Sequence, residues 1–131
     1  MREPDKVGLD THKKILVVED NTGVSEVLCE LMEIFGFKPQ AIAKNYEEAV
    51  QLFDLHKPDL VTLDIHLEGD KTGVEVAEYI RQKSSTPFIF ISSAIDDVTM
   101  NRAKSSKPYA HLIKPIDAQM LEDTLKSIFA Y

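Results

Sequence analysis

The sequence predicts an α/β fold in which a five-stranded parallel sheet lies between two layers of helices, the doubly wound arrangement. Short apolar runs alternate five times with stretches whose apolar residues recur every three or four positions, which indicates five pairs of strand and helix. The apolar runs are continuous, as in strands that are buried on both faces. The length of 131 residues allows one such domain and little beyond it.

The first two pairs occupy the first half of the chain. Residues 15–18 form a run of Ile, Leu and Val, and apolar side chains at helical spacing then extend over residues 24–35. Residues 40–43 form the second run, and residues 46–53 show the second helical pattern. Asn45, with a glutamate three positions later, resembles the capping pair that starts a helix.

The third and fourth pairs differ in strength. Residues 60–63 form an apolar run that precedes helical spacing over residues 76–80. Residues 88–91 form the fourth run, but residues 97–104 after it are mostly polar and carry three apolar side chains. This segment is the weakest of the five helix predictions. We expect the acidic pair at its start to cap the helix rather than to form a second metal site.

The fifth pair completes the predicted domain. Residues 110–113 are the last apolar run, and we expect the helix that follows to begin at an Asp117 cap. Residues 1–12 are polar and show no periodicity, so they are expected to form a flexible leader. The folded domain is therefore placed at residues 13–131.

The composition argues against several classes of function. The chain has 15 basic and 22 acidic residues, and the net charge of −7 repels nucleic-acid phosphates, which argues against direct DNA binding. The apolar runs are far shorter than the ~20 residues that span a bilayer, and we expect a cytoplasmic protein without membrane association. The single cysteine, Cys29, cannot form an internal disulfide and is expected to be a packing residue.

Polar side chains follow four of the predicted strands at the points where the strands end. Glu19 and Asp20 follow the first strand, Asp64 the third, Ser92 the fourth and Lys114 the fifth. Open α/β sheets bind ligands at the carboxyl ends of their strands. In the common strand order 2-1-3-4-5, the first and third strands are neighbours at the point where the order reverses. The three carboxylates should therefore meet in one crevice.

Three carboxylates in one crevice need compensation. Two unit charges ~4 Å apart repel by about 4 kcal/mol at an effective dielectric constant near 20, so either one carboxylate holds a proton or a cation is bound. A few oxygen ligands suit Mg²⁺. The Lys114 ammonium and the Ser92 hydroxyl, beside such a cation, would surround a tetrahedral anion. The pocket is therefore predicted to hold a phosphoryl group on Asp64.

Four segments resemble the receiver domain of two-component response regulators. They are Lys-Ile-Leu-Val-Val-Glu-Asp-Asn at 14–21, Pro-Asp-Leu-Val-Thr-Leu-Asp at 58–64, Pro-Phe-Ile-Phe-Ile-Ser at 87–92 and Lys-Pro at 114–115. The likeness covers residues 13–130, and the combined spacing of the four segments makes it specific. It implies a flavodoxin-like fold with strand order 2-1-3-4-5. Because 131 residues leave no room for an output domain, we expect a receiver domain of the stand-alone type.

The resemblance implies a role for each pocket residue. Asp64 would be the phosphoacceptor, and Asp20 and Asp64 would bind Mg²⁺ together with the backbone carbonyl of His66. Glu19 would act on the metal largely through water, and Lys114 would contact the phosphoryl oxygens. These roles agree with elementary chemistry, since a carboxylate is a nucleophile and the cations offset the charge of the transferred group.

The resemblance also implies partners and a switch. The donor would be a phosphohistidine of a histidine kinase or a histidine phosphotransfer protein, so we expect a signalling domain rather than an enzyme. Ser92, which fits the motif spacing better than Ser93, would move toward the phosphoryl group. His111 occupies the place of an aromatic residue that would then turn inward; an exposed strand histidine without a role is the alternative. The surface of the fourth helix and fifth strand would regulate a downstream protein.

Two other functions compete with this interpretation. A Mg²⁺-dependent phosphatase of similar fold is disfavoured because Asp64 is followed by Ile65 and His66, without the common second aspartate. A vestigial interaction module is disfavoured because all five pocket residues are present. The loop after Asp64 departs from the family pattern, with Glu68 at a common proline position and an extra residue before Gly73. These departures bear on kinase specificity and loop shape.

Overall fold

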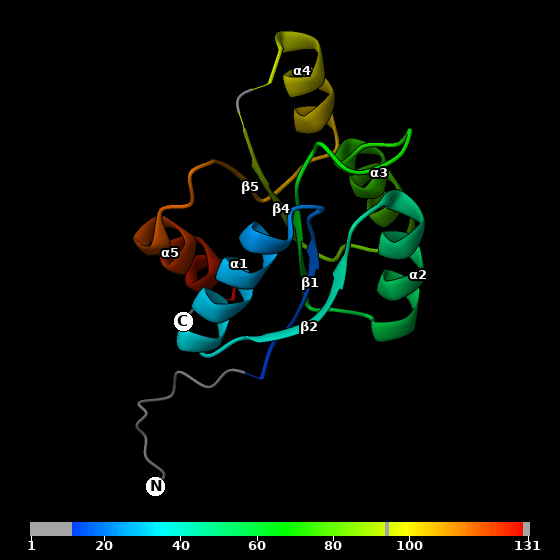
Figure 1. Cartoon of the computed structure of the whole chain (residues 1–131). Coiled ribbons are helices and arrows are strands. Elements are labelled where there is room, and N and C mark those ends of the chain that lie inside the picture. The colour runs from blue at the N-terminus through cyan, green and yellow to red at the C-terminus, as the bar shows by residue number, and fades with distance from the viewer. Residues whose placement is uncertain (1–11, 94, 130–131) are drawn as a thin grey trace, which may run out of the picture.

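The computed structural model describes residues 12–93 and 95–129, and it confirms the predicted doubly wound fold (Figure 1). The parallel sheet has the strand order β2-β1-β3-β4-β5. The strands are β1 (Lys14–Val18), β2 (Lys38–Ala43), β3 (Leu60–Leu63), β4 (Phe88–Ser92) and β5 (Ala110–Ile113). The helices are α1 (Thr22–Ile34), α2 (Tyr46–His56), α3 (Gly73–Lys83), α4 (Asp97–Ser105) and α5 (Ala118–Ile128). None of the helices in the described ranges is long and apolar enough to cross a membrane.

Part of the predicted domain organisation lies outside the described residues. The leader predicted at residues 1–12 falls there except for His12, and so do the last two residues of the domain predicted at 13–131. The elements themselves run from Lys14 to Ile128, within the predicted domain, and every predicted strand and helix is present in the predicted order.

Helices cover both faces of the sheet, with α1 and α5 on one face and α2 and α3 on the other (Figure 1). Side chains alternate along β1, so that Ile15 and Val17 pack with α1 and α5 while Leu16 and Val18 pack with α2 and α3. Almost every residue of β1, β3 and β4 is buried, which explains the continuous apolar runs of the sequence. Cys29, a partly buried residue of α1, packs against the core between the sheet and helices α1 and α5, and burial raises the pKa of its thiol.

The helix starts follow the predicted capping chemistry in part. The Asn45 side chain accepts a hydrogen bond from the Glu48 N–H as expected, but the Glu48 carboxylate accepts one from the Lys44 N–H rather than from Asn45. The reciprocal pair occurs instead at Thr72 and Glu75, which fix the start of α3. The predicted caps of the last two helices are present, since Asp96 and Asp117 side chains accept from the N–H groups of Thr99 and Met120.

α4 confirms the weakest helix prediction and has little apolar anchoring. Ala103 is the one residue of this helix that is buried. Polar contacts attach α4 to α3, because Arg102 forms an ion pair with both oxygens of Glu78 at 2.8 and 3.0 Å. Arg81 of α3 also donates to the Ser106 carbonyl, 3.4 Å away at the end of α4. Exposed ion pairs contribute little to stability, so α4 can shift at small cost.

Candidate functional site

Backbone hydrogen bonds between neighbouring strands bring the predicted site residues to one end of the sheet. The Asp64 N–H donates to the Val18 carbonyl at 2.8 Å, which sets the residue after β3 beside the end of β1. The Lys114 N–H donates to the Ser92 carbonyl at 2.8 Å and so joins the ends of β5 and β4. The two acids predicted after β1 directly follow it. The strand order therefore gathers the predicted residues, as expected from the sequence.

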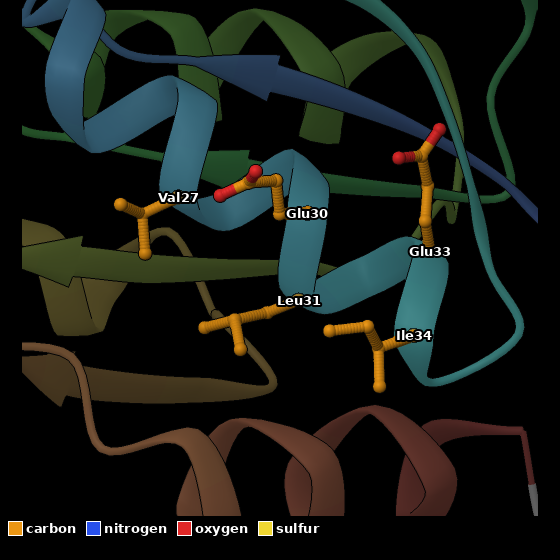
Figure 2. A pocket seen from close by; sticks show the side chains of 5 residues that line it. All are labelled: Val27, Glu30, Leu31, Glu33 and Ile34. Carbon is orange, nitrogen blue, oxygen red and sulfur yellow. The ribbon is translucent and has the colours of Figure 1, made fainter.

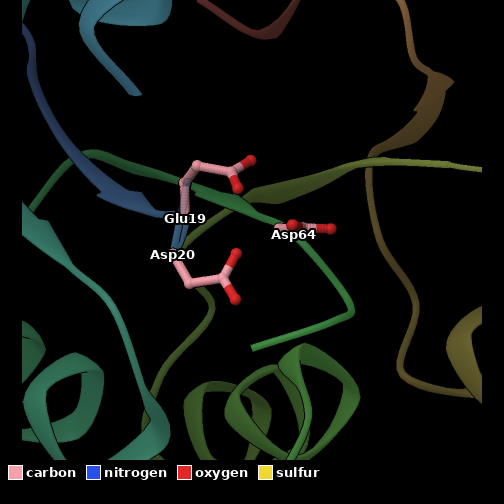
Figure 3. A group of neighbouring side chains, drawn as sticks. All are labelled: Glu19, Asp20 and Asp64. Atoms are coloured by element: carbon pink, nitrogen blue, oxygen red, sulfur yellow. The ribbon is translucent and has the colours of Figure 1, made fainter. Parts of the chain in front are cut away.

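Glu19, Asp20 and Asp64 form a compact acidic cluster (Figure 3). One carboxylate oxygen from each residue lies within 4.8 Å of the others. Glu19 is 1% exposed and Asp64 is 6% exposed, whereas Asp20 is partly exposed. Three oxygen donors, one of them partly exposed to water, match the preference of Mg²⁺, which keeps several waters when it is bound. The donor chemistry of the cluster thus fits a hard divalent cation.

Lys114 extends across the end of the sheet into this cluster. Its Nζ lies 2.8 Å from Glu19 Oε1 and 3.2 Å from Asp64 Oδ2. Burial by itself lowers the pKa of this ammonium group, but the hydrogen bond with Glu19 and the charges of Asp64 and Glu19 outweigh burial and raise the pKa above its ordinary value. Lys114 therefore stays charged and offsets part of the negative charge of the cluster.

Glu19 is the carboxylate of the cluster that takes up a proton near neutral pH. Burial raises its pKa from 4.5 to about 7, although the hydrogen bonds from Lys114 and from the Asn21 N–H lower it. The nearby charge of Asp64 adds to the rise. The Asn21 nitrogen lies 3.1 Å from Glu19 Oε2. Without a bound cation, Glu19 is therefore partly protonated near pH 7.

Ser92 and His111 contact each other across β4 and β5. Ser92 is fully buried, and its Oγ lies 2.9 Å from His111 Nε2, whereas Ser93 is exposed. The sequence predicts that His111 turns inward only as Ser92 moves, but the ring already lies beside Ser92 and against Phe90. The Ser92 hydroxyl and the Phe90 ring thus contact the His111 ring in an inward orientation, although Asp64 carries no phosphoryl group. Burial, and then the charge of Lys104, lowers the pKa of His111.

Gly73, the first residue of α3, supports the site. A Cβ atom at this position would lie 1.9 Å from the Asp64 carbonyl oxygen, so glycine alone lets α3 begin this close to Asp64. The Gly73 N–H donates to the Ile65 carbonyl at 2.8 Å. The sequence signal that could indicate this role is a glycine directly after Thr72, the residue that caps α3. His66, in the same loop, has an exposed side chain, and its carbonyl stays a predicted ligand.

Comparison with known sequences relates this chain to one family. The sequence profile of the response regulator receiver domain matches residues 15–126. The transcriptional regulatory protein PdtaR of Mycobacterium tuberculosis is 29% identical over 103 residues, which are 79% of this chain and 50% of that protein. The positive alginate biosynthesis regulatory protein of Pseudomonas aeruginosa is 31% identical over 114 residues, 86% of this chain and 45% of that protein. The chain spans about half the length of these curated relatives.

Solved structures share the fold. The signal receiver domain of a modulated diguanylate cyclase from Desulfovibrio desulfuricans has a TM-score of 0.83 at 33% identity, over 88% of this chain and 91% of that chain. A two-component response regulator from Clostridium difficile also has a TM-score of 0.83, at 27% identity over 90% of this chain and 96% of that chain. The doubly wound sheet with strand order 2-1-3-4-5 is thus the receiver fold.

The raised pKa of Glu19 predicts that the metal-free protein loses stability as the pH rises. Between 4.5 and about 7 the native state binds more protons at Glu19 than the unfolded chain, so the free energy of unfolding falls with rising pH. Glu19→Gln should remove this contribution. Denaturant unfolding of both proteins in EDTA, at about pH 5 and about pH 7.5, measures it. The same pH slope in both proteins would contradict the raised pKa.

Proposed function

The chain belongs to the response regulator receiver family, and from this premise we propose that it accepts a phosphoryl group on Asp64. The donor is a phosphohistidine of a histidine kinase or a histidine phosphotransfer protein. The observation that carries the proposal is the buried Asp64 carboxylate, 3.2 Å from the Lys114 ammonium and inside the acidic cluster. A carboxylate in this setting can attack phosphorus because nearby positive charge offsets the repulsion between the two anions.

Each pocket residue has a part in the proposed transfer. An Asp64 oxygen attacks the phosphorus, the bond from phosphorus to the histidine nitrogen breaks, and the imidazole leaves with the electron pair. Lys114 offsets the charge on the phosphoryl oxygens. Asp20 and Asp64, with the His66 carbonyl, would hold Mg²⁺, and Glu19 would act on it largely through water. A cation bound there supplies further charge neutralisation at the transferred group.

We propose that the signal leaves through the surface formed by β4, α4 and β5. Ser92 at the end of β4 would donate its hydroxyl hydrogen to a phosphoryl oxygen and move the loop that leads into α4. A hydrogen bond to a charged group contributes roughly 1.5 to 3 kcal/mol, which is enough to bias a weakly held helix. α4 suits this role because Ala103 is its one buried residue. The altered surface would regulate a downstream protein, or the phosphoryl group would pass to another histidine.

Two rival functions fit the site less well. A phosphatase for small substrates on a similar fold commonly has a second aspartate two positions after the nucleophile, whereas the exposed His66 occupies that position here. A vestigial interaction module would have no use for Lys114 held between two buried carboxylates, since burying charged groups costs stability. We therefore propose a signalling domain that carries one phosphoryl group, not an enzyme with many turnovers.

An apolar groove leads from the site along α1, and we propose that the phosphodonor lies in it. Its upper part, about 400 Å³, is lined by Lys114 and the first turns of α1. Val27 connects it to a second hollow of about 560 Å³ toward the end of α1. Figure 2 shows Leu31 and Ile34 directed toward α5, and Glu30 and Glu33 line the same hollow. Because the groove opens at Lys114, an amphipathic helix that covers it would bring a phosphohistidine to Asp64.

Asp64→Asn should abolish phosphorylation without unfolding the chain, because it removes the nucleophile and one charge of a repelling cluster. Incubation with Mg²⁺ and acetyl phosphate, followed by intact mass measurement, should show one added phosphoryl group on the parent and none on Asp64→Asn. Asp70→Asn, at an exposed aspartate in the same loop, is the control. Repeated release of phosphate from added substrates would favour the phosphatase, and an unchanged parent mass would favour the interaction module. Equal labelling of Asp64→Asn would exclude Asp64 as phosphoacceptor.

Ile34→Asp should slow phosphorylation by a protein donor but not by acetyl phosphate, because it places a charge in the groove and leaves the pocket intact. Histidine kinases of the same genome, each autophosphorylated, are offered in turn to find one that labels the parent. With that kinase we expect a loss of about tenfold or more, which is about 1.4 kcal/mol. Leu55→Asp on α2 is the matched control, since Leu55 is 72% and Ile34 is 71% exposed. Equal slowing in both variants would contradict docking along α1.

A further inference from the structure

The His111 ring lies within hydrogen-bonding distance of the Ser92 hydroxyl, the group that the proposed switch requires. Ser92 Oγ is fully buried and lies 2.9 Å from His111 Nε2. In the part of the chain that the structure describes, His111 is the hydrogen-bond partner of this hydroxyl. A buried hydroxyl hydrogen without an acceptor is costly. The tautomer of the neutral ring decides which atom donates. We infer the tautomer with the proton on Nδ1, because Nε2 then accepts the Ser92 hydrogen, which would otherwise have no acceptor among the described residues.

This hydrogen bond conflicts with the proposed role of Ser92. A serine hydroxyl has one hydrogen and cannot donate it to two acceptors, while phosphoryl oxygens can only accept. As long as Nε2 accepts, the hydroxyl has no hydrogen for a phosphoryl group on Asp64. When the ring is protonated, its Nε2–H donates to the Ser92 oxygen, and the hydroxyl hydrogen becomes free.

We propose that His111 is a positioning residue for Ser92: the neutral ring holds the hydroxyl hydrogen away from Asp64, and a phosphoryl group must compete for it. The inference rests on the proposed phosphorylation of Asp64 and adds a competitor within the pocket. Two events break the hydrogen bond from the Ser92 hydroxyl to His111 Nε2. One is protonation of the His111 ring at low pH, and the other is competition from a phosphoryl group on Asp64. His111 thereby sets how readily Ser92 responds.

The groups around the ring keep it neutral near pH 7. From β4 it faces the Ser92 hydroxyl and the Phe90 ring, whose centroid is 5.6 Å from that of His111, and neither is charged. From α4, Lys104 disfavours a second positive charge, and burial disfavours it more strongly, so the pKa of His111 lies below 6.5. His111 should therefore restrain Ser92 at neutral pH.

A cycle of four proteins tests whether His111 acts through Ser92. The parent, His111→Phe, Ser92→Ala and the double variant are titrated with beryllofluoride in excess Mg²⁺ at about pH 7.5, and calorimetry gives each Kd. His111→Phe keeps a ring beside Phe90 but offers no acceptor, so it should tighten binding about two- to tenfold, the value of one neutral hydrogen bond. In the Ser92→Ala background the same change should leave the Kd unaltered. Equal tightening in both backgrounds, or none in either, would overturn the inference.

The pH dependence gives a readout that packing alone would not change. The ratio of the parent Kd to the His111→Phe Kd should be largest near about pH 8, where the ring is neutral, and should fall toward one as the pH drops below 6.5 and the ring takes up a proton. Titration of the acidic cluster affects both proteins and cancels in the ratio. His111→Gln, whose amide oxygen accepts without titrating, should restore the parent Kd at about pH 7.5 but not its pH dependence. A constant ratio across this range would overturn the inference.

Failure of the inference and failure of the proposed function give different results. If Asp64 is not the phosphoacceptor, the parent and all variants fail to bind beryllofluoride, and both proposals are overturned. If the proposed function holds and the inference is wrong, the proteins bind but the cycle shows no coupling between His111 and Ser92. Should His111→Phe melt far below the parent, His111→Leu, which also lacks a ring nitrogen, takes its place in the cycle.

Discussion

Three carboxylates and one ammonium group share the end of this sheet, and the excess of negative charge governs the rest of the site. Lys114 offsets part of it through contacts of 2.8 Å with Glu19 and 3.2 Å with Asp64. Two like charges ~4 Å apart still repel by about 4 kcal/mol at an effective dielectric constant near 20. Burial is the main cause of the raised pKa of Glu19, about 7, and the negative charge of Asp64 adds to the rise. The same imbalance makes the cluster receptive to a divalent cation.

The fold holds this cluster rigidly and leaves the surface beside it easy to move. Asp64 is fixed by the β1 carbonyl that its N–H contacts and by the close approach of Gly73. On the other side of the pocket, His111 is the one hydrogen-bond partner of the Ser92 hydroxyl among the described residues, and the loop beyond Ser92 leads to a helix attached by exposed polar contacts. A phosphoryl group on Asp64 would therefore act on the weakly held side while the acidic cluster stays in place.

The sequence predicts the cluster well because its members follow strand ends, and a parallel sheet brings strand ends together whatever the side chains do. The contact of Ser92 with His111 depends on more than strand order. Phe90 pairs with His111 in the β4 and β5 register, so the ring reaches Ser92 diagonally and only from an inward orientation. The approach of Gly73 to Asp64 likewise depends on the path of a loop. Periodicity carries no information on either.

Stabilisation by Mg²⁺ tests the charge imbalance most directly. Unfolding is measured with rising Mg²⁺ for the parent, for Asp20→Asn, and for Asp70→Asn, which changes an exposed aspartate outside the cluster. A cation that binds the native state raises the free energy of unfolding with its concentration. We predict that the parent and Asp70→Asn are stabilised at millimolar Mg²⁺ while Asp20→Asn loses most of this effect. Equal stabilisation of all three proteins would contradict the account.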